Sequence, residues 1–160
     1  MKNALDYLTW EHVELGVRIT GCDKSFEGSM VIPDHINGVA VVEIGEKALA
    51  ECKKITSVAL PNSVEVVGEE AFKVCSKLEE LHLGAGIKKI EPRAFQWCRS
   101  LKSVKIPGTV ESVGVGAFSE CSGLEDLHLG AGIKKIEKCA FLRCSSLKSV
   151  EIPGSVESVG

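Results

Sequence analysis

The cysteines are the residues whose chemistry and spacing stand out first in this sequence. Two of the seven, Cys22 and Cys139, follow no pattern, while the other five recur every 23 residues, at Cys52, Cys75, Cys98, Cys121 and Cys144. Thiols can form disulfides or bind soft metals, but no CxxC pair or histidine-rich cluster accompanies these five, which argues against zinc. Side chains at one phase of a repeat point the same way and not toward each other, which disfavours disulfides. We therefore expect a column of buried thiols that donate weak S–H hydrogen bonds to backbone carbonyls, with exposed, reactive thiols at Cys22 and Cys139.

Two histidines, His82 and His128, occupy the same position of the repeat, two repeats apart. Ligands of one zinc ion must approach each other within about 3–4 Å. Two repeats of a stacked β-structure separate equivalent side chains by about 10 Å, and Lys105 stands between these two. The sequence therefore predicts no metal site and no cofactor.

No catalytic constellation is recognisable. The serines lie outside any nucleophile elbow, and no histidine is expected in a cleft beside one. The segment LGAGIKK, at residues 83–89 and 129–135, has a superficial likeness to a phosphate loop, but it lacks the full glycine spacing and leads into no helix. Its glycines are expected to form turns, and the chain is not expected to be an enzyme.

Trp97 departs from the repeat pattern. Its counterparts in the other repeats are Glu51, Val74, Glu120 and Arg143. In one interpretation the indole packs over the turns of neighbouring repeats. In the other it anchors a binding partner, as partly exposed tryptophans often do. The sequence leaves both interpretations open.

The elements that position these residues follow from one repeated pattern, A-F-x-x-C-x-x-L-x-x-(L/V)-x-(I/L)-(P/G)-x-x-(V/I)-x-x-(V/I)-(G/E). Its central part, as in LKSVKIP at residues 101–107, alternates apolar and polar residues, which is typical of a strand with one buried face. A proline or glycine then turns the chain, and VESVG supplies a second short apolar pair. The A-F-x-x-C segment is too short for an independent helix and is expected to form a tight turn or a 3₁₀ piece. No unit can bury its apolar face alone, so the units must stack as a solenoid.

This pattern resembles the BspA-type leucine-rich repeats over residues from about 31 to 160. The resemblance implies an α/β-type repeat solenoid with a parallel sheet on one face and short turns or 3₁₀ pieces on the other. Residues 44–160 would form five leucine-rich repeats of 23 residues, the last one incomplete, after an N-terminal β cap and widened first turn at residues 1–43. In the cap we expect a type I′ turn at Asn37-Gly38 and inward packing of Trp10, Val13, Val17 and Ile19.

The composition limits the classes of function. Charged residues make up 26% of the chain and the net charge is −3, with both signs mixed throughout, so no electrostatic footprint for nucleic acid or an anionic membrane is present. No apolar run reaches the roughly 18–20 residues that span a bilayer. The start, MKNALDYLTWEH, has no apolar core of a signal peptide. We therefore expect neither membrane insertion nor a secretory signal, and the compartment stays open.

The repeat also has a two-unit period, because residues 78–114 and 124–160 are identical at 29 of 37 positions. Exposed strand positions alternate in charge from one repeat to the next, as in the column Thr56, Glu79, Lys102, Glu125 and Lys148. An in-register stack brings equivalent positions within about 4.8 Å, so identical charges would repel and alternating charges attract. We infer that the two-unit period reflects electrostatic stacking.

Together these features predict a protein-interaction module that binds through the exposed face of the parallel sheet. The candidate residues are Glu79, Glu80, His82, Lys102, Lys105, Glu125, Asp126, His128, Lys148 and Glu151. The family resemblance implies adhesion or host-matrix binding by cell-surface or secreted proteins, with a protein partner of unknown identity. The alternative is a structural, self-assembling element. The last repeat breaks off before its closing A-F-x-x-C, and Ile152, Val156 and Val159 would form an uncovered end that pairs two copies into a homodimer.

Charge reversal tests the electrostatic explanation of the two-unit period. The double substitution Lys102→Glu and Lys148→Glu creates a column of like charges. We expect it to lower the free energy of unfolding by roughly 0.2–1 kcal/mol per exposed pair, and by more at low salt than at high salt. Urea unfolding at two ionic strengths measures the effect, and unchanged stability at both would contradict the explanation.

Overall fold

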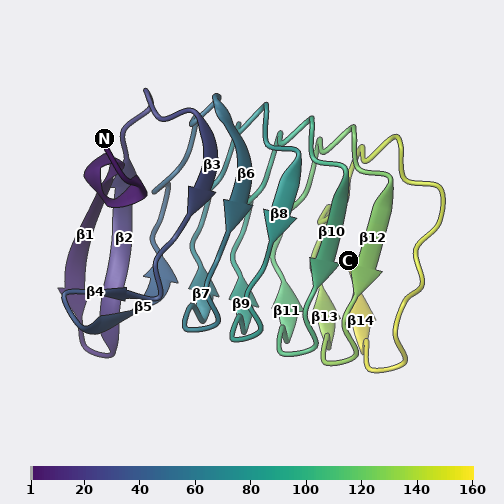
Figure 1. The fold of residues 1–160 in the computed structure, drawn as a ribbon. Helices are drawn as coiled ribbons and strands as arrows, with labels where there is room; N and C mark the ends of the chain where they lie inside the picture. Colours follow the sequence, from purple (N-terminus) through teal and green to yellow (C-terminus); the bar gives the residue numbers. More distant parts are fainter. Residues whose placement is uncertain (1) are drawn as a thin grey trace.

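The computed structural model describes residues 2–160, which form a β-solenoid of about six turns with almost no helix. Successive 23-residue turns, called rungs below, stack along one axis, and the N-terminal cap closes one end (Figure 1). Within residues 2–160 the one helical piece is a 3₁₀ turn in the cap, η1 (Ala4–Tyr7). The predicted leucine-rich-repeat solenoid is confirmed, and the A-F-x-x-C segments form consecutive turns.

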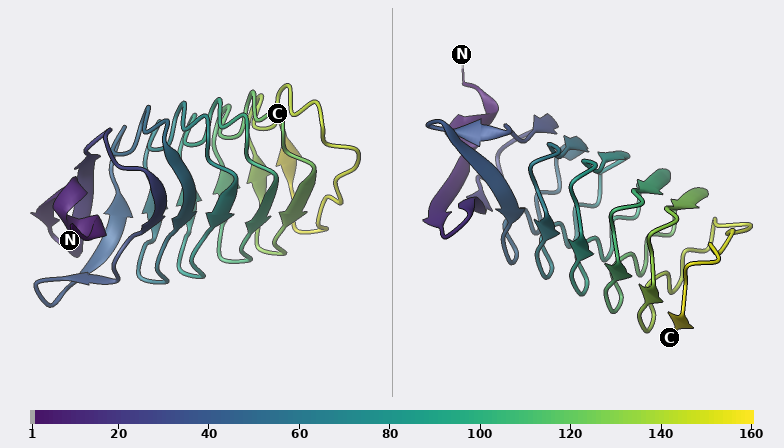
Figure 2. Two further views of the ribbon diagram at one scale, coloured as in Figure 1. Left: turned by 45° about the horizontal axis from the view of Figure 1, so that its top comes forward. Right: turned by 90° about the horizontal axis from the view of Figure 1, so that it is seen from below.

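Two ladders of parallel strands run along the stack (Figure 2). The long-strand sheet consists of β3 (Gly28–Val31), β6 (Ile55–Ala59), β8 (Glu80–His82), β10 (Ser103–Ile106) and β12 (Asp126–Leu129). The short-strand sheet consists of β5 (Val39–Ile44), β7 (Val66–Val67), β9 (Lys89–Ile90), β11 (Ser112–Val113), β13 (Lys135–Ile136) and β14 (Ser158–Val159). The solenoid therefore has a strand ladder on two of its sides and turns between them.

The pairing is in phase from rung to rung. Val58 pairs with Leu81, and Val104 pairs with Leu127, an offset of 23 residues in both cases. Within β10 burial alternates, since Val104 and Ile106 are buried while the residues between and before them are exposed. The period-2 pattern of the sequence therefore places one apolar set in the core and one polar set on the outer face of the sheet.

The cap is built from an antiparallel hairpin, β1 (Leu8–Val13) and β2 (Gly16–Cys22), that extends the short-strand sheet through β5. The short strand β4 (His35–Ile36) pairs with β5 through a two-residue turn at Asn37 and Gly38. Both turn residues have positive φ, 52° and 79°, so the predicted type I′ turn is confirmed. Of the side chains predicted to pack inward, the last two, at positions 17 and 19, are fully buried.

The prediction for Trp10 is wrong, and that for Val13 is only partly right. Trp10 is 36% exposed, and Val13 is half-buried. A register shift between Thr9 and Trp10 interrupts the β1–β2 pairing, and a shift of one residue exchanges the two faces of a strand. Alternation along the sequence therefore misassigned the inward face of β1.

The core consists of columns of identical side chains. The rings of Phe72, Phe95, Phe118 and Phe141 stack along the axis with centroids 5.0–5.6 Å apart. Beside them the cysteine column is buried, and four of its five thiols, all except that of Cys52, donate to a carbonyl of the preceding rung, as Cys98 does to Phe72 at 3.2 Å. The same bond is made by Cys75, Cys121 and Cys144, each at 3.2 Å. The predicted ladder of buried thiols is confirmed.

A third ladder joins the A-F-x-x-C turns, and all of its hydrogen bonds point the same way. In one rung the N–H groups of Glu70, Phe72 and Val74 donate to carbonyls of the next rung at 2.7–3.0 Å. Four rungs contribute three such bonds each, and every donor faces the C-terminal end of the stack. The geometry needs left-handed backbone, as at Val74 and Trp97, each with φ 62°, a conformation that costs a non-glycine residue energy. Stacking on the next rung offsets that cost.

The two-unit period has a steric cause that the sequence analysis did not identify. The first, third and fifth rungs turn at a proline, in Pro61-Asn62, Pro107-Gly108 and Pro153-Gly154, whereas the second and fourth turn at Gly84-Ala85-Gly86 and Gly130-Ala131-Gly132. A Cβ built on any of the four glycines of the second set would overlap backbone atoms of the proline turn beneath it. Each glycine turn therefore nests directly on a proline turn, and a turn with side chains at the two glycine positions does not fit there.

The electrostatic explanation receives limited support. Between the short-strand positions, Lys88 and Glu65 form an ion pair at 2.9 Å. Among residues 2–160, neither Lys102 nor Lys148 has an acidic partner within ion-pair distance. Exposed pairs contribute little, so the nesting of turns is the stronger cause of the period.

The nesting can be tested with matched glycine substitutions. In Gly132→Ala the new methyl group would overlap the carbonyl of Gly108, and backbone cannot move aside cheaply. We expect a loss of about 1–3 kcal/mol in the free energy of unfolding, measured by urea denaturation. In the control Gly108→Ala the nearest neighbouring atom is 3.8 Å away, so stability should be unchanged or slightly higher. Equal effects of the two substitutions would contradict the nesting.

The reactivity of the thiols provides a second test of the fold. Cys139 is exposed as predicted, but the prediction for Cys22 is wrong, because Cys22 is half-buried and packs against the core. Contact with Cys52, together with burial, raises the pKa of Cys22 well above that of a free thiol. Burial also raises the pKa of Cys75 to about 12 and that of Cys144 to about 11.

Only thiolates attack disulfide reagents quickly. At pH 8 we therefore expect one fast thiol per chain toward an aromatic disulfide reagent, with the others reacting on unfolding. The contact with Cys22 lowers the pKa of Cys52, but that thiol is 1% exposed and out of reach of the reagent. The substitution Cys139→Ser should remove the fast phase. A fast phase of two or more thiols, or one that survives this substitution, would refute the assignment.

Candidate functional site

All ten sequence-predicted surface residues are exposed. Five lie on strands of the long-strand sheet, Glu79, Lys102 and Glu125 directly precede those strands, and Lys148 and Glu151 lie on the segment that follows β12 by one rung. The pairing of β10 with β12 sets Lys105 beside His128, and β6 with β8 sets Ala59 beside His82. These side chains share one face because strand residues two apart point the same way and the rungs are in register. His82, Lys105 and His128 therefore lie in one exposed column along the stack.

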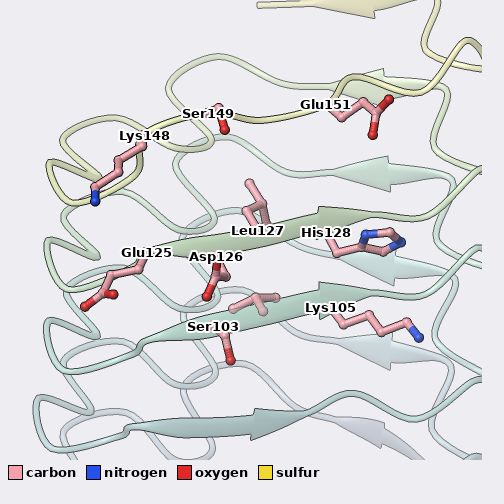
Figure 3. A pocket seen from close by; sticks show the side chains of 10 residues that line it. Ser103, Lys105, Glu125, Asp126, Leu127, His128, Lys148, Ser149 and Glu151 are labelled. Atoms are coloured by element: carbon pink, nitrogen blue, oxygen red, sulfur yellow. The ribbon is translucent and has the colours of Figure 1, made fainter.

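A hollow of about 580 Å³ lies on this face at its C-terminal end. Figure 3 shows its lining, with β10 and β12 on one side and residues 148–151 on the other. Six of the ten predicted residues line it, namely Lys105, Glu125, Asp126, His128, Lys148 and Glu151. The other lining residues, which were not predicted from the sequence, are Ser103, Val104, Leu127 and Ser149. Ser103 and Ser149 lie two residues before Lys105 and Glu151, on the same face. The period-2 pattern of a strand could therefore have predicted both serines.

The hollow exists because the last rung separates from β12. Within residues 2–160, no backbone hydrogen bond joins residues 147–152 to β12, and these residues are not a strand. On the other side of the same rung, β14 pairs normally with β13. Leu127, whose counterpart Val104 is buried, is half-buried as a result. The last rung is thus attached along one sheet and open along the other.

The surface carries both positive and negative side chains, and these form almost no ion pairs with one another. Of the ten residues, His82 and Glu80 approach each other at 3.8 Å, and no other ion pair within residues 2–160 involves any of them. Side chains without internal partners can form charged contacts with a ligand without first breaking old ones.

Four of the predicted residues lie away from the hollow. Glu79, Glu80 and Lys102 occupy the same face nearer the cap, and His82 lines a second, smaller hollow of about 400 Å³ with Lys105 and Pro107. The face is therefore continuous, but the hollow concentrates its chemistry between the last two long strands and residues 148–151.

Trp97 does not belong to this face, because it lies on a turn of the A-F-x-x-C side. Its side chain is 36% exposed, and the Lys73 ammonium lies 5.5 Å from the ring centroid. Together with Val74, Ser76 and Arg99 it lines a hollow of about 310 Å³. The packing interpretation thus accounts for one side of the ring, and the other side remains accessible.

The predicted self-association end is also exposed in part. Ile152 and Val159 are 50% and 64% exposed, whereas Val156 is half-buried and packs against the core. Within residues 2–160 no group of three His, Cys, Asp or Glu side chains is placed to hold a metal ion. The described part of the chain also contains no helix with the length and apolar character needed to cross a membrane.

In-phase rungs with phenylalanine and cysteine columns define a leucine-rich-repeat solenoid. More specifically, this chain belongs to the BspA-type leucine-rich repeat family, whose model matches residues 42–160 in six copies. The family is a repeat scaffold and typically not enzymatic.

Solved structures agree with this assignment. A leucine-rich repeat protein from T. pallidum (TpLRR) is 32% identical with a TM-score of 0.90, over 96% of this chain and 72% of that one. A leucine-rich repeat protein from Bacteroides ovatus is 25% identical with a TM-score of 0.66, over 94% and 53% of the two chains. A leucine-rich cell surface protein from Faecalibacterium prausnitzii is 25% identical with a TM-score of 0.65, over 94% and 48%.

The chain thus spans about half the length of two of these similar proteins. No curated protein sequence matches it. What the comparisons establish is a leucine-rich repeat protein similar to a bacterial cell-surface protein of the same class.

Proposed function

We propose that this protein is a non-enzymatic interaction module that binds another protein through the outer face of its long-strand sheet. The hollow between β12 and residues 148–151 is the centre of the binding surface. The observation that carries the proposal is the set of exposed charges on this face, which have almost no partners within the chain. A face of this kind presents side chains that can vary without affecting the stack, because only the inward set builds the core.

The mixed signs indicate the chemistry of the partner. Lys105 and Lys148 lie at the hollow together with Glu125, Asp126 and Glu151, so a partner with both basic and acidic groups fits better than a uniformly charged polymer. Similarity to a protein described as a leucine-rich cell surface protein supports adhesion or host-matrix binding as the setting.

Binding to a panel of purified extracellular-matrix proteins tests the proposal. For any matrix protein that the chain binds, we expect Lys105→Glu or Asp126→Lys to weaken the affinity at least about tenfold, since central charged contacts are commonly worth more than about 1.4 kcal/mol. Biolayer interferometry measures the dissociation constants, and both losses should shrink at high salt.

Two charge-matched substitutions on the cap provide the controls. Lys24 and Glu14 are exposed and lie away from the hollow, so Lys24→Glu and Glu14→Lys should leave the affinity unchanged. Equal losses from the cap and face variants would rule out the face as the binding surface. Failure to bind every matrix protein would remove the matrix-adhesion setting.

A further inference from the structure

The hollow beside Trp97 lies on the A-F-x-x-C side of the solenoid and shares no residue with the sheet face. It measures about 310 Å³ and is lined by Val74 and Ser76 on one rung and by Trp97 and Arg99 at the equivalent positions of the next. The Lys73 ammonium lies 5.5 Å from the centroid of the indole ring, which is partly exposed. The hollow therefore offers an apolar ring surface together with a hydroxyl group and a guanidinium group.

Basic side chains gather on the same side of the stack. Lys54 and Lys77 occupy equivalent positions of adjacent rungs. Lys53 stands one rung before Ser76, and Arg99 stands one rung after it. All four basic side chains are exposed, and in-register stacking spaces equivalent positions by about 4.8 Å. The cations therefore extend along the axis over three successive rungs.

These charges are not neutralised by the chain itself. Within residues 2–160, Lys54, Lys77 and Arg99 form no ion pair, and Lys53 approaches Glu51 only at 3.9 Å. Like charges at neighbouring positions repel each other, in contrast to the alternating charges of the strand positions. The net charge of the chain is −3, so this is a local excess of positive charge that a bound anion would compensate.

The arrangement defines two properties of a ligand. Cations that recur over three rungs suit an extended molecule with acidic groups repeated along its length. The apolar hollow suits a ring that packs one face against the indole, while the Arg99 guanidinium can form bidentate hydrogen bonds to an oxyanion. A pyranose ring with a carboxylate or sulfate group combines an apolar C–H face, hydroxyl groups and an acidic group in one unit.

Other polyanions match less well. Single-stranded nucleic acids stack successive bases on several aromatic side chains, but the residues equivalent to Trp97 are Glu51, Val74, Glu120 and Arg143, none of which is aromatic. An acidic peptide carries charges on flexible side chains and has no ring that bears both hydroxyl and acidic groups. One aromatic surface beside a row of cations therefore favours an acidic sugar polymer.

We propose that the turn-side patch, defined as Lys53, Lys54, Lys77, Trp97 and Arg99, binds a linear anionic polysaccharide. One sugar ring packs on the indole in the hollow, and its acidic group pairs with Arg99. The three lysines pair with the acidic groups of neighbouring sugars along the chain. This patch is separate from the sheet face, so the present proposal and the proposed protein-binding function stand or fall separately.

The experiment titrates the full chain with a heparin oligosaccharide, which is sulfated, and with an oligogalacturonate of similar length, which is carboxylated. In a Trp10→Phe background Trp97 is the one remaining tryptophan, so a change in its fluorescence reports contact with the indole. We expect this change with at least one of the two, with an affinity that falls as salt rises. The tighter of the two identifies the preferred acidic group.

Isothermal titration calorimetry then compares variants. In Trp97→Val the new residue is the one that stands one rung earlier, at Val74, with the same φ of 62°, so the fold should be kept. We expect this substitution to weaken the affinity at least about tenfold and Lys77→Gln to weaken it about threefold. The control Lys134→Gln removes an exposed lysine that directly precedes β13 and should leave the affinity unchanged.

Three outcomes would overturn the proposal. The first is that neither oligosaccharide binds, and the second is that Trp97→Val binds as tightly as the unaltered chain. The third is that a single-stranded oligothymidylate or poly-L-glutamate of matched charge binds as tightly as the better oligosaccharide, because the sugar ring would then contribute nothing.

Discussion

The constraint on which the whole molecule depends is that no rung satisfies its own backbone. Strand amides and the amides of the A-F-x-x-C turns find their partners one rung away, in three parallel ladders. In-phase stacking at about 4.8 Å then turns each sequence position into a column along the axis. The phenylalanine stack and the thiol ladder are two such columns. Each residue must therefore pack against the equivalent residues of the rungs before and after it.

The two-unit period allows the turns of successive rungs to pack against one another. A side chain in the place of either glycine of a glycine turn would overlap the proline turn beneath, so a second proline turn, which carries side chains at these positions, does not fit there. Alternation of large and small turns is thus a packing requirement, of the kind that close-packed interiors impose. The alternating charges accompany it and add at most the small energy of exposed pairs. A duplicated 46-residue unit preserves both properties together, because it keeps each kind of rung next to the other.

Properties that repeat could be predicted from the sequence, because their physical cause lies in the period. The thiol column and the exposed face follow from spacing, whereas the type I′ turn at Asn37-Gly38, which does not repeat, follows from residue type alone. Properties that depend on an end or an irregularity could not be predicted. The register shift that exposes Trp10, the contact that covers Cys22 and the separation of residues 147–152 from β12 each involve one rung with no counterpart. The single direction of the third ladder could not be predicted either, because the direction of backbone N–H groups does not affect the pattern of side chains.

The sheet face and the turns of the solenoid are therefore under different constraints. On the sheet face the exposed residues can change with little cost to the stack, so affinity and specificity there depend on side chains such as Lys105 and Asp126. In the turns, the steric requirement is set by the backbone, as where Gly130 and Gly132 lie against Pro107-Gly108. Substitution can scarcely alter those features without damaging the rung itself. The nested turns therefore fix the order in which the rungs stack, whereas a surface made of free side chains can select an individual protein.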